Sequence, residues 1–333
     1  MSAGCLEVSF PIKIISNMAA PNVVITLTGT DPWENLAAEE LLWQELKGIA
    51  LVLYRNAPSL ILGRHQNPWR EVRWEEVGRR GFPLLRRSTG GGTVWHDEGN
   101  LNFSFLWGQS TYRREALQNF VAETLRSRGF PVVVGEKGDL LLEVTNGTDG
   151  PNEANWTTLR KISGHAYAFR GGRVLHHATL LCQARLDDLR SVLGTTGELV
   201  DWVGTASRPM PVANLGWEPA EATQSLIEAF VKREKAVSVT PWEALGISEA
   251  EWHEKKRHFR DRLSSPEWTW DITPPFRWQG RVKGGSGSFR VEDGLVREGP
   301  TPKDEGKFFF SGDFFEYLPK RSSEFTKKGQ EVP

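Results

Sequence analysis

Apolar and polar positions recur along the chain with two different periods, which predict a mixture of helices and strands. Residues 31–48, DPWENLAAEELLWQELKG, carry helix signals at both ends. Asp31 can cap the N-terminus, with Pro32 at the first helical position and Glu34 completing a capping box. Gly48 follows the last turn. Further helices are predicted within 111–129, 219–234 and 248–263.

Short apolar runs bounded by glycine and proline predict strands. The clearest run, LNFSFLW at 101–107, alternates between apolar and polar residues. Its two faces carry Leu101, Phe103, Phe105 and Trp107 on one side and Asn102 and Ser104 on the other. The other predicted strands lie within 23–29, 49–55, 59–64, 83–89, 131–144, 158–169 and 173–184. The elements follow no regular βαβ rhythm, which predicts an α+β fold around a largely antiparallel sheet.

Composition excludes several classes of function. The chain has 333 residues and a net charge of -1, with 41 basic and 42 acidic residues, which argues against general nucleic-acid binding. The only cysteines, Cys5 and Cys182, lack metal-ligand spacing, so we expect a reducing compartment and no metal site. No apolar run approaches the roughly 20 residues that span a bilayer, so no membrane association is expected.

Changes in composition divide the chain into four parts. Residues 1–24 are poor in acidic residues but lack the arginines typical of transit peptides, so they are either a targeting segment or a loose N-terminus. Residues 25–236 form the predicted main domain. A helix capped by Ser248 and a tryptophan-rich segment predict a small accessory domain over 237–300. Residues 301–333, rich in Lys, Glu, Ser and Pro, predict a disordered polar tail with an aromatic patch.

The stretch RRSTGGGTVWHDEGN, residues 86–100, is the strongest chemical signal in the chain. Three consecutive glycines leave the amides of residues 90–93 bare and allow backbone conformations closed to other residues. Such a loop can surround an anion, and Arg86 or Arg87 can add charge-assisted hydrogen bonds to phosphate or carboxylate oxygens. A tight turn between strands would also explain the glycines, but it requires neither the arginine pair nor the GTVWHDEGN that follows.

The longer stretch RRSTGGGTVWHDEGNLNFSF resembles the signature of the lipoate-protein ligase and lipoyltransferase family. Two further family elements follow in order, GDLLLE with RKISGHAY (160–167), and HHATLL (176–181). The upstream GRHQNPWREV is similar to the animal mitochondrial lipoyltransferase branch. The resemblance covers residues 25–235 and implies a biotin/lipoate-ligase-like catalytic domain.

The resemblance also implies a reaction, in which the enzyme binds lipoyl-AMP and transfers its lipoyl group to a lysine of an acceptor lipoyl domain. Lys161 is the predicted catalytic residue, because an ammonium about 4 Å from an oxygen of the mixed anhydride gains about 4 kcal/mol at an effective dielectric constant of 20. On a strand its side chain shares a face with Ser163 and His165. The predicted lipoyl-AMP-binding residues are Arg87, Gly90, Gly91, Gly92, Thr93, Val94, Trp95, Lys137 and Thr179.

Partners and location follow from the same resemblance. The expected acceptors are lipoyl domains of the E2 subunits of 2-oxoacid dehydrogenases and the carrier protein of the glycine cleavage system. Lipoyl-AMP is the expected substrate, with ATP and Mg needed only if the protein activates lipoate itself. We expect a monomer in the mitochondrial matrix, with the cytoplasm as the alternative.

Three functions remain open from the sequence. The first is an amidotransferase that uses lipoyl-AMP or a lipoylated carrier protein as donor. The second is a full ligase that makes the adenylate from lipoate and ATP. The third is a scaffold that binds acceptor domains without modifying them, which Lys161 and the triple glycine argue against.

Some positions depart from the family pattern. Trp95 replaces Tyr or Phe, and is either a packed core aromatic or a ligand-stacking residue. Lys137 precedes GDLLLE where relatives place Asn or Phe before the Asp, so Asp139 matches the family better. His165 replaces a small Ser or Thr and either narrows the pocket or lies at its rim. The polar segment 144–159 predicts a surface insertion.

Two rival chemistries are also visible in the sequence. His96 and Asp97 could form a base oriented by a carboxylate, but neighbouring strand residues point to opposite faces, which favours structural roles. Cys182 could form a thioester, as in the octanoyltransferases. Since Thr179 and Cys182 lie on opposite faces of the predicted strand, Cys182 is predicted to be a buried apolar residue.

Overall fold

The computed structural model describes residues 21–146, 156–195, 198–315 and residue 318. Most of the predicted N-terminal segment and the middle of the predicted insertion, residues 147–155, lie outside these ranges. Within the described residues, no helix is both long and apolar enough to cross a membrane.

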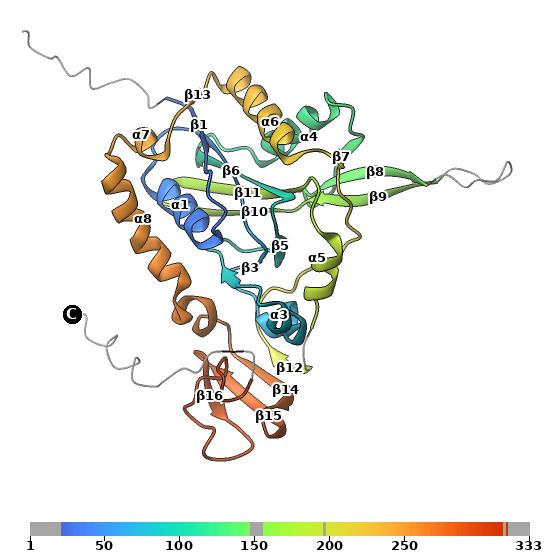
Figure 1. Cartoon of the computed structure of the whole chain (residues 1–333), viewed down its shortest axis with the longest axis vertical. Helices are drawn as coiled ribbons and strands as arrows, with labels where there is room; N and C mark the ends of the chain where they lie inside the picture. Colours follow the sequence, from blue (N-terminus) through green and yellow to red (C-terminus); the bar gives the residue numbers. More distant parts are fainter. Residues whose placement is uncertain (1–20, 147–155, 196–197, 316–317, 319–333) are drawn as a thin grey trace, which may run out of the picture.

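A six-stranded sheet occupies the upper half of the molecule as drawn (Figure 1), in the order β10, β11, β6, β2, β1, β13. The pairs from β10 to β2 are antiparallel, whereas β1 pairs in parallel with both β2 and β13. The strands span Val23–Thr26 (β1), Ala50–Arg55 (β2), Asn100–Gly108 (β6), His165–Arg170 (β10), Arg173–Leu181 (β11) and Val237–Ser238 (β13). The predicted α+β class with a largely antiparallel sheet is therefore confirmed.

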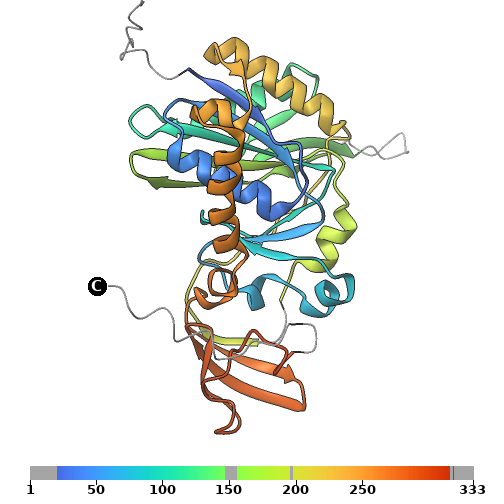
Figure 2. The same ribbon diagram turned by 60° about the vertical axis from the view of Figure 1, so that its left-hand side comes forward.

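Helices cover both faces of this sheet. One face packs against α4 (Arg114–Arg126) and α6 (Pro219–Glu234), and the other against α1 (Pro32–Glu45), along which α8 (Glu249–Ser264) lies (Figures 1 and 2). Asp31 caps α1 as predicted, accepting hydrogen bonds from the amides of Trp33 and Glu34. The cap satisfies two of the amides left free in the first turn.

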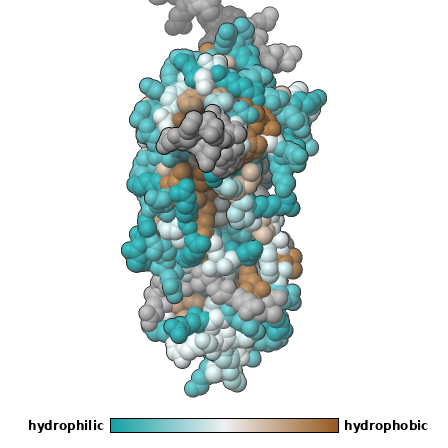
Figure 3. All heavy atoms as spheres, turned by 90° about the vertical axis from the view of Figure 1, so that its right-hand side faces the viewer, coloured by the Kyte–Doolittle hydropathy of each residue, from teal (hydrophilic) through white to brown (hydrophobic). Residues whose placement is uncertain are grey.

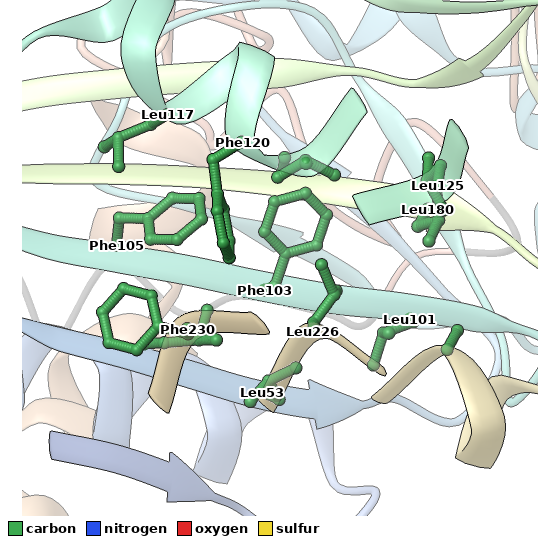
Figure 4. Close-up of a cluster of buried hydrophobic side chains, with 14 of the residues drawn as sticks. Leu53, Leu101, Phe103, Phe105, Leu117, Phe120, Leu125, Leu180, Leu226 and Phe230 are labelled. Carbon is green, nitrogen blue, oxygen red and sulfur yellow. The ribbon is translucent and has the colours of Figure 1, made fainter. Parts of the chain in front are cut away.

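The alternation in β6 directs its two sets of side chains to different surroundings. The apolar set, including Phe103 and Phe105, packs with Phe120 of α4 and Phe230 of α6 (Figure 4). Asn102 and Ser104 point to the opposite face, where they are buried as well. The second face is therefore an interior face too, on which these polar groups are buried beside the apolar side chains that pack on α1.

Two small sheets extend from the large one. The first contains β3 (Ser59–Leu62), β4 (Leu84–Arg86) and β5 (Val94–His96), in the order β4, β3, β5. The second is the run β7 (Val132–Val134), β8 (Leu140–Asn146) and β9 (Trp156–Ser163). The described ends of the predicted insertion thus belong to the β8–β9 hairpin. The remaining helices are α2 (Pro68–Glu71), α3 (Trp74–Arg80), α5 (Leu186–Val192), α7 (Pro241–Leu245) and the π-helix η1 (Glu267–Asp271).

The accessory region differs from the predicted boundaries. Its sheet contains β14 (Phe276–Val282), β15 (Gly285–Glu292) and β16 (Leu295–Glu298), but also β12 (Glu198–Trp202), which comes from inside the predicted main domain. Helix α8, expected to belong to the accessory domain, instead packs on α1. The predicted boundary at residue 236 therefore does not separate two packing units.

The predicted tail is also partly folded. Four phenylalanines of the aromatic patch are at most 4% exposed, and three of the four contact Trp69 of α2. They are Phe309, Phe310, Phe314 and Phe315. Burying four aromatic rings outweighs the polar composition of the segment around them, so the prediction of disorder from residue 301 is wrong up to residue 315.

Candidate active site

Two adjoining cavities lie beside the glycine-rich stretch. One, of about 560 Å³, is bordered by five arginines and is called here the arginine cavity. The other, of about 610 Å³, is bordered by residues of β2, β3, β6 and β11 and is called the sheet cavity. The arginines of the first are Arg70, Arg73, Arg160, Arg190 and Arg208. Residues that border both cavities include Thr93, Val94, Lys161, Gly164, Thr179 and Ser207.

The three glycines have different structural requirements. Gly91 has φ +87°, in the left-handed region, and a Cβ there would lie 3.0 Å from the Arg87 guanidinium. A Cβ on Gly92 would lie 2.8 Å from the Ser207 hydroxyl. Gly90 has an ordinary φ and open space where a Cβ would be, so a side chain is excluded only at the second and third positions.

The loop leaves amides available for a ligand. Among the described residues, the N–H groups of Gly90, Gly91 and Gly92 donate no hydrogen bond. The predicted fourth amide is not available, because the N–H of Thr93 donates to Ser207 Oγ at 2.9 Å. Three successive amides of this kind match the concave backbone sites that bind anions.

The arginine pair before the loop holds protein atoms together. Arg87 is buried and donates to the carbonyls of Gly90 and Gly92, both at 2.7 Å, and to Thr89 Oγ1 at 3.0 Å. Arg86 donates to the carbonyl of Thr269 and to other backbone oxygens. Burial lowers the pKa of Arg86 to about 9 and that of Arg87 to about 10. Arg87 also borders the sheet cavity. Its hydrogen bonds hold the carbonyls of the glycine loop, so Arg87 fixes the shape of the loop that was expected to bind an anion.

The residues after the loop divide between the cavities and the core. Thr93 and Val94 border both cavities, and Thr93 Oγ1 donates to Gln66 Oε1 at 2.8 Å. Trp95 borders the arginine cavity but is only 1% exposed, and its indole N–H donates to Asp97 Oδ2 at 2.9 Å. Trp95 is therefore a packed core aromatic, the first of the two alternatives left open for it.

Lys161 lies where the two cavities meet. Its Nζ is 3.0 Å from Asp139 Oδ2, and both side chains are about a quarter exposed. Its Cε lies 3.3 Å from the place a Cβ would occupy on Gly164, so a larger residue at 164 would crowd the lysine. Thr179 Oγ1 accepts a hydrogen bond from the Gly164 amide at 3.3 Å. Asp139 thus orients the ammonium, and Lys137 borders only the sheet cavity.

The rival chemistries have no support in the geometry. The carboxylate of Asp97 accepts from Trp95, Gly99 and Arg185, while Nδ1 of His96 is bonded to Asn56 at 2.9 Å. Burial, with a smaller effect of Arg87, lowers the pKa of His96 to about 3. Burial likewise raises the pKa of the Cys182 thiol to about 12, which disfavours the thiolate needed for thioester chemistry.

The sequence did not reveal the buried polar cluster at the inner end of the sheet cavity. His177 Nδ1 lies 2.9 Å from Glu39 Oε2, and its Nε2 is 2.6 Å from Thr89 Oγ1. Glu39 also accepts from Tyr54 and Ser104. Burial opposes the charge of Glu39, but His177 and these hydroxyls outweigh it, so the pKa of Glu39 is lowered. The HHATLL motif was the only signal for this cluster, because Glu39 lies within an otherwise regular helix.

Several cations border the arginine cavity. Among the described residues, the side chains of Arg70, Arg160 and Arg208 make no hydrogen bond or ion pair. Leu159 and Met210 are 46% and 41% exposed. The face toward which the β8–β9 hairpin points exposes an apolar strip among hydrophilic side chains (Figure 3). Unpaired arginines beside exposed apolar groups are typical of a surface that meets an anionic partner.

The chain is similar in sequence to known proteins. Residues 31–233 match the family model described as "Lipoyl protein ligase A/B catalytic domain". The chain is 34% identical over 207 residues to the lipoate-protein ligase A of Blochmanniella pennsylvanica, an alignment that covers 60% of this chain and spans only 58% of that relative.

Solved structures show the same fold. An archaeal bi-partite lipoate protein ligase from Thermoplasma acidophilum superposes with a TM-score of 0.57 and 26% identity, over 76% of this chain and 96% of that one. A lipoate-protein ligase A bound with ATP has a TM-score of 0.57 and 26% identity, over 76% of this chain and 98% of that one.

Proposed function

Because the chain belongs to the lipoyl protein ligase A/B catalytic domain family, we propose that it is a lipoyl amidotransferase that moves a lipoyl group from lipoyl-AMP to a lysine of an acceptor lipoyl domain. The observation that carries this proposal is the position of Lys161 on the shared wall of two cavities. A mixed anhydride has two unlike halves, and its reactive carbonyl lies between them. A cation at the junction of two cavities is the group that such a substrate requires.

The two cavities suit the two halves of lipoyl-AMP. The sheet cavity has apolar walls, including Leu36, Ile61 and Ala178, which suit the lipoyl chain. The arginine cavity suits the nucleotide, because its five arginines can pair with the phosphate. Of the glycine loop, only Gly92 borders either of these cavities, and it borders the sheet cavity. Lys161 then stabilises the charge that develops on the anhydride oxygens as the lysine amine attacks.

A matched pair of assays tests the proposal. Purified protein is mixed with an acceptor lipoyl domain and either preformed lipoyl-AMP or lipoate with ATP and Mg, and the mass of the domain is measured. We expect a lipoyl mass increase with lipoyl-AMP, and its absence would contradict the proposal. A mass increase with lipoate and ATP as well would make the protein a full ligase. The relatives described as ligases, one of them bound with ATP, favour this second candidate.

Acceptors and location are part of the same proposal. The archaeal relative was studied with its E2 lipoyl domain, so we propose E2 lipoyl domains as the first acceptors to test, and the glycine cleavage carrier protein as the second. We place the protein in the mitochondrial matrix, on the resemblance of GRHQNPWREV to the animal branch. Imaging of a fusion without residues 1–25 tests this location, because loss of matrix signal is expected if those residues direct import.

A further inference from the structure

A second set of hydrogen bonds lies on the other side of β11 and has no role in the proposed function. Ser163 Oγ lies 3.1 Å from His165 Nε2, His165 Nδ1 lies 3.0 Å from His176 Nε2, and His176 Nδ1 lies 3.1 Å from the Tyr112 hydroxyl. These four side chains, Ser163, His165, His176 and Tyr112, are called here the histidine chain. His165 borders the sheet cavity, and its two ring nitrogens are both hydrogen-bonded within the chain.

The histidine chain connects the active site with the surface. At one end, Ser163 borders the arginine cavity, as Lys161 does, and is only 1% exposed. At the other end, Tyr112 is half-buried, and the neighbouring Tyr167 is 41% exposed. A proton released beside Ser163 therefore has a continuous hydrogen-bonded path to the outside of the protein.

The histidine chain can pass a proton without holding one. A neutral imidazole donates through one nitrogen and accepts through the other, so the chain has two consistent orientations that differ by the shift of one proton along each hydrogen bond. Burial, followed by the neighbouring His176 and then Lys161, lowers the pKa of His165, and burial lowers that of His176 to about 3. Burial raises the pKa of Tyr112. All the titratable members are therefore neutral at physiological pH.

The charged and titratable groups around the two histidine rings act in the same direction. Lys161 of β9 and His177 of β11 disfavour a positive charge on His165, and Arg114 at the start of α4 does so at His176. Around Tyr112 they act in opposite directions, since Arg114 lowers its pKa whereas Tyr167 and Glu115 raise it. A proton is thus not trapped on either ring between the two ends.

We propose that the histidine chain is a relay that carries the proton of the acceptor lysine from the active site to solvent. This inference rests on the proposed function. In the transfer step, the lysine nitrogen forms a bond to the lipoyl carbonyl carbon, and the carbon–oxygen bond to phosphate breaks, with its electron pair leaving on AMP. Before attack, the ammonium proton of the lysine passes to Ser163, each member hands its own proton to the next, and Tyr112 releases one to water. The second proton, lost from the nitrogen as the amide forms, leaves with the phosphate of AMP.

The need for such a relay follows from the pKa of lysine. With an ordinary pKa near 10.4, roughly one lysine side chain in a thousand is unprotonated at neutral pH. An amine bound in the active site must lose its proton there before or during attack. General base assistance of this kind contributes about 100-fold or more to rate.

Two acceptors that differ in protonation test the relay. Tyr112→Phe removes the terminal hydroxyl far from the cavities, and His165→Gln interrupts the middle of the chain. Single-turnover transfer from preformed lipoyl-AMP is measured to an acceptor lipoyl domain and, separately, to hydroxylamine, which is largely unprotonated at neutral pH. Both variants should slow transfer to the lipoyl domain about 10- to 100-fold at pH 7, with recovery as the pH rises toward the pKa of lysine. Tyr112 borders neither cavity, so Tyr112→Phe should leave the reaction with hydroxylamine unchanged.

The matched control is Tyr167→Phe. Its hydroxyl accepts from Arg114 at 3.1 Å and is not part of the histidine chain, so both reactions should keep their wild-type rates. Equal slowing of both reactions in Tyr112→Phe, or no slowing in either, would overturn the relay. Failure of the wild-type protein with lipoyl-AMP would instead contradict the proposed function, so the two failures are distinguishable.

Discussion

Two adjacent histidines of β11 belong to networks of different character on the two faces of the sheet. His177 faces α1 and joins Glu39 to Thr89 and, through it, to Arg87 beneath the glycine loop. His176 faces α4 and belongs to the neutral histidine chain. The first network contains two buried charged groups, Glu39 and Arg87, and Arg87 holds the loop carbonyls in place. The second contains no charge and can exist in either of two orientations.

The difference shows how one strand can serve two purposes. Buried charges are stable only when every partner is in place, so the network around His177 favours a single rigid arrangement. A neutral hydrogen-bonded chain has no comparable preference between its two orientations. One face is therefore suited to holding a binding loop and the other to moving a proton.

The largest expected effect concerns Lys161, which lowers the pKa of His165 in the histidine chain and borders the sheet cavity together with Gly92 of the loop. Lys161→Ala should slow transfer from preformed lipoyl-AMP about 100- to 1000-fold, because a preorganised cation is lost. Single-turnover kinetics measure this. Lys137→Ala is the matched control, since Lys137 borders only the sheet cavity, and its loss should cost much less. Near-normal transfer by Lys161→Ala would remove Lys161 from the mechanism.

The charged network can be broken directly at Glu39. Glu39→Gln keeps the shape but removes the charge that His177 and the hydroxyls stabilise, so unfolding in urea should show a loss of about 3 kcal/mol. Tyr54→Phe removes one neutral hydrogen bond to the same carboxylate and should cost about 1 kcal/mol. Equal loss of stability in the two variants would show that the charge of Glu39 contributes no more than one of its hydrogen bonds.

The glycine loop sharpens the comparison, because Arg87 connects it to the charged network. Gly91→Val places a branched side chain at φ +87° and against the Arg87 guanidinium, and should cost about 1 to 3 kcal/mol of stability and most of the affinity for lipoyl-AMP. Gly90→Ala meets open space and should have little effect. Melting temperatures with and without lipoyl-AMP separate the two effects. An undiminished ligand-induced shift in Gly91→Val would show that the loop is only a turn.

The smallest expected effect is on pH dependence. Burial keeps His96, His165 and His176 neutral, with pKa values below those of unfolded histidine. Their contribution to stability is therefore complete above pH 6.5 and is lost as the pH falls below that value toward 3. Between pH 6.5 and 5.5 each histidine should cost about 1 kcal/mol. In urea unfolding, His96→Asn should reduce the loss of stability between pH 6.5 and 5.5 by about 1 kcal/mol. An unchanged loss of stability would mean that His96 is not held neutral.

Much of the fold could be predicted from local pattern. The Asp31 cap, the two faces of β6 and the strand that carries Lys161 all follow from spacing along the chain. The same alternation predicts that His176 and His177 point to opposite faces. Such features depend on residues a few positions apart, so the sequence expresses them directly.

The partners of these side chains were decided by tertiary structure. Arg87 was predicted to contact a ligand, but it donates to the loop carbonyls, and Glu39 reaches His177 across 138 positions of sequence. The aromatic patch predicted to lie in a disordered tail packs around Trp69, about 240 residues earlier in the chain. The sequence by itself determined which side chains face inward and where the chain can bend. Which inward-facing groups meet depends on how distant segments pack, because burial requires a partner for each polar group but no local signal names it.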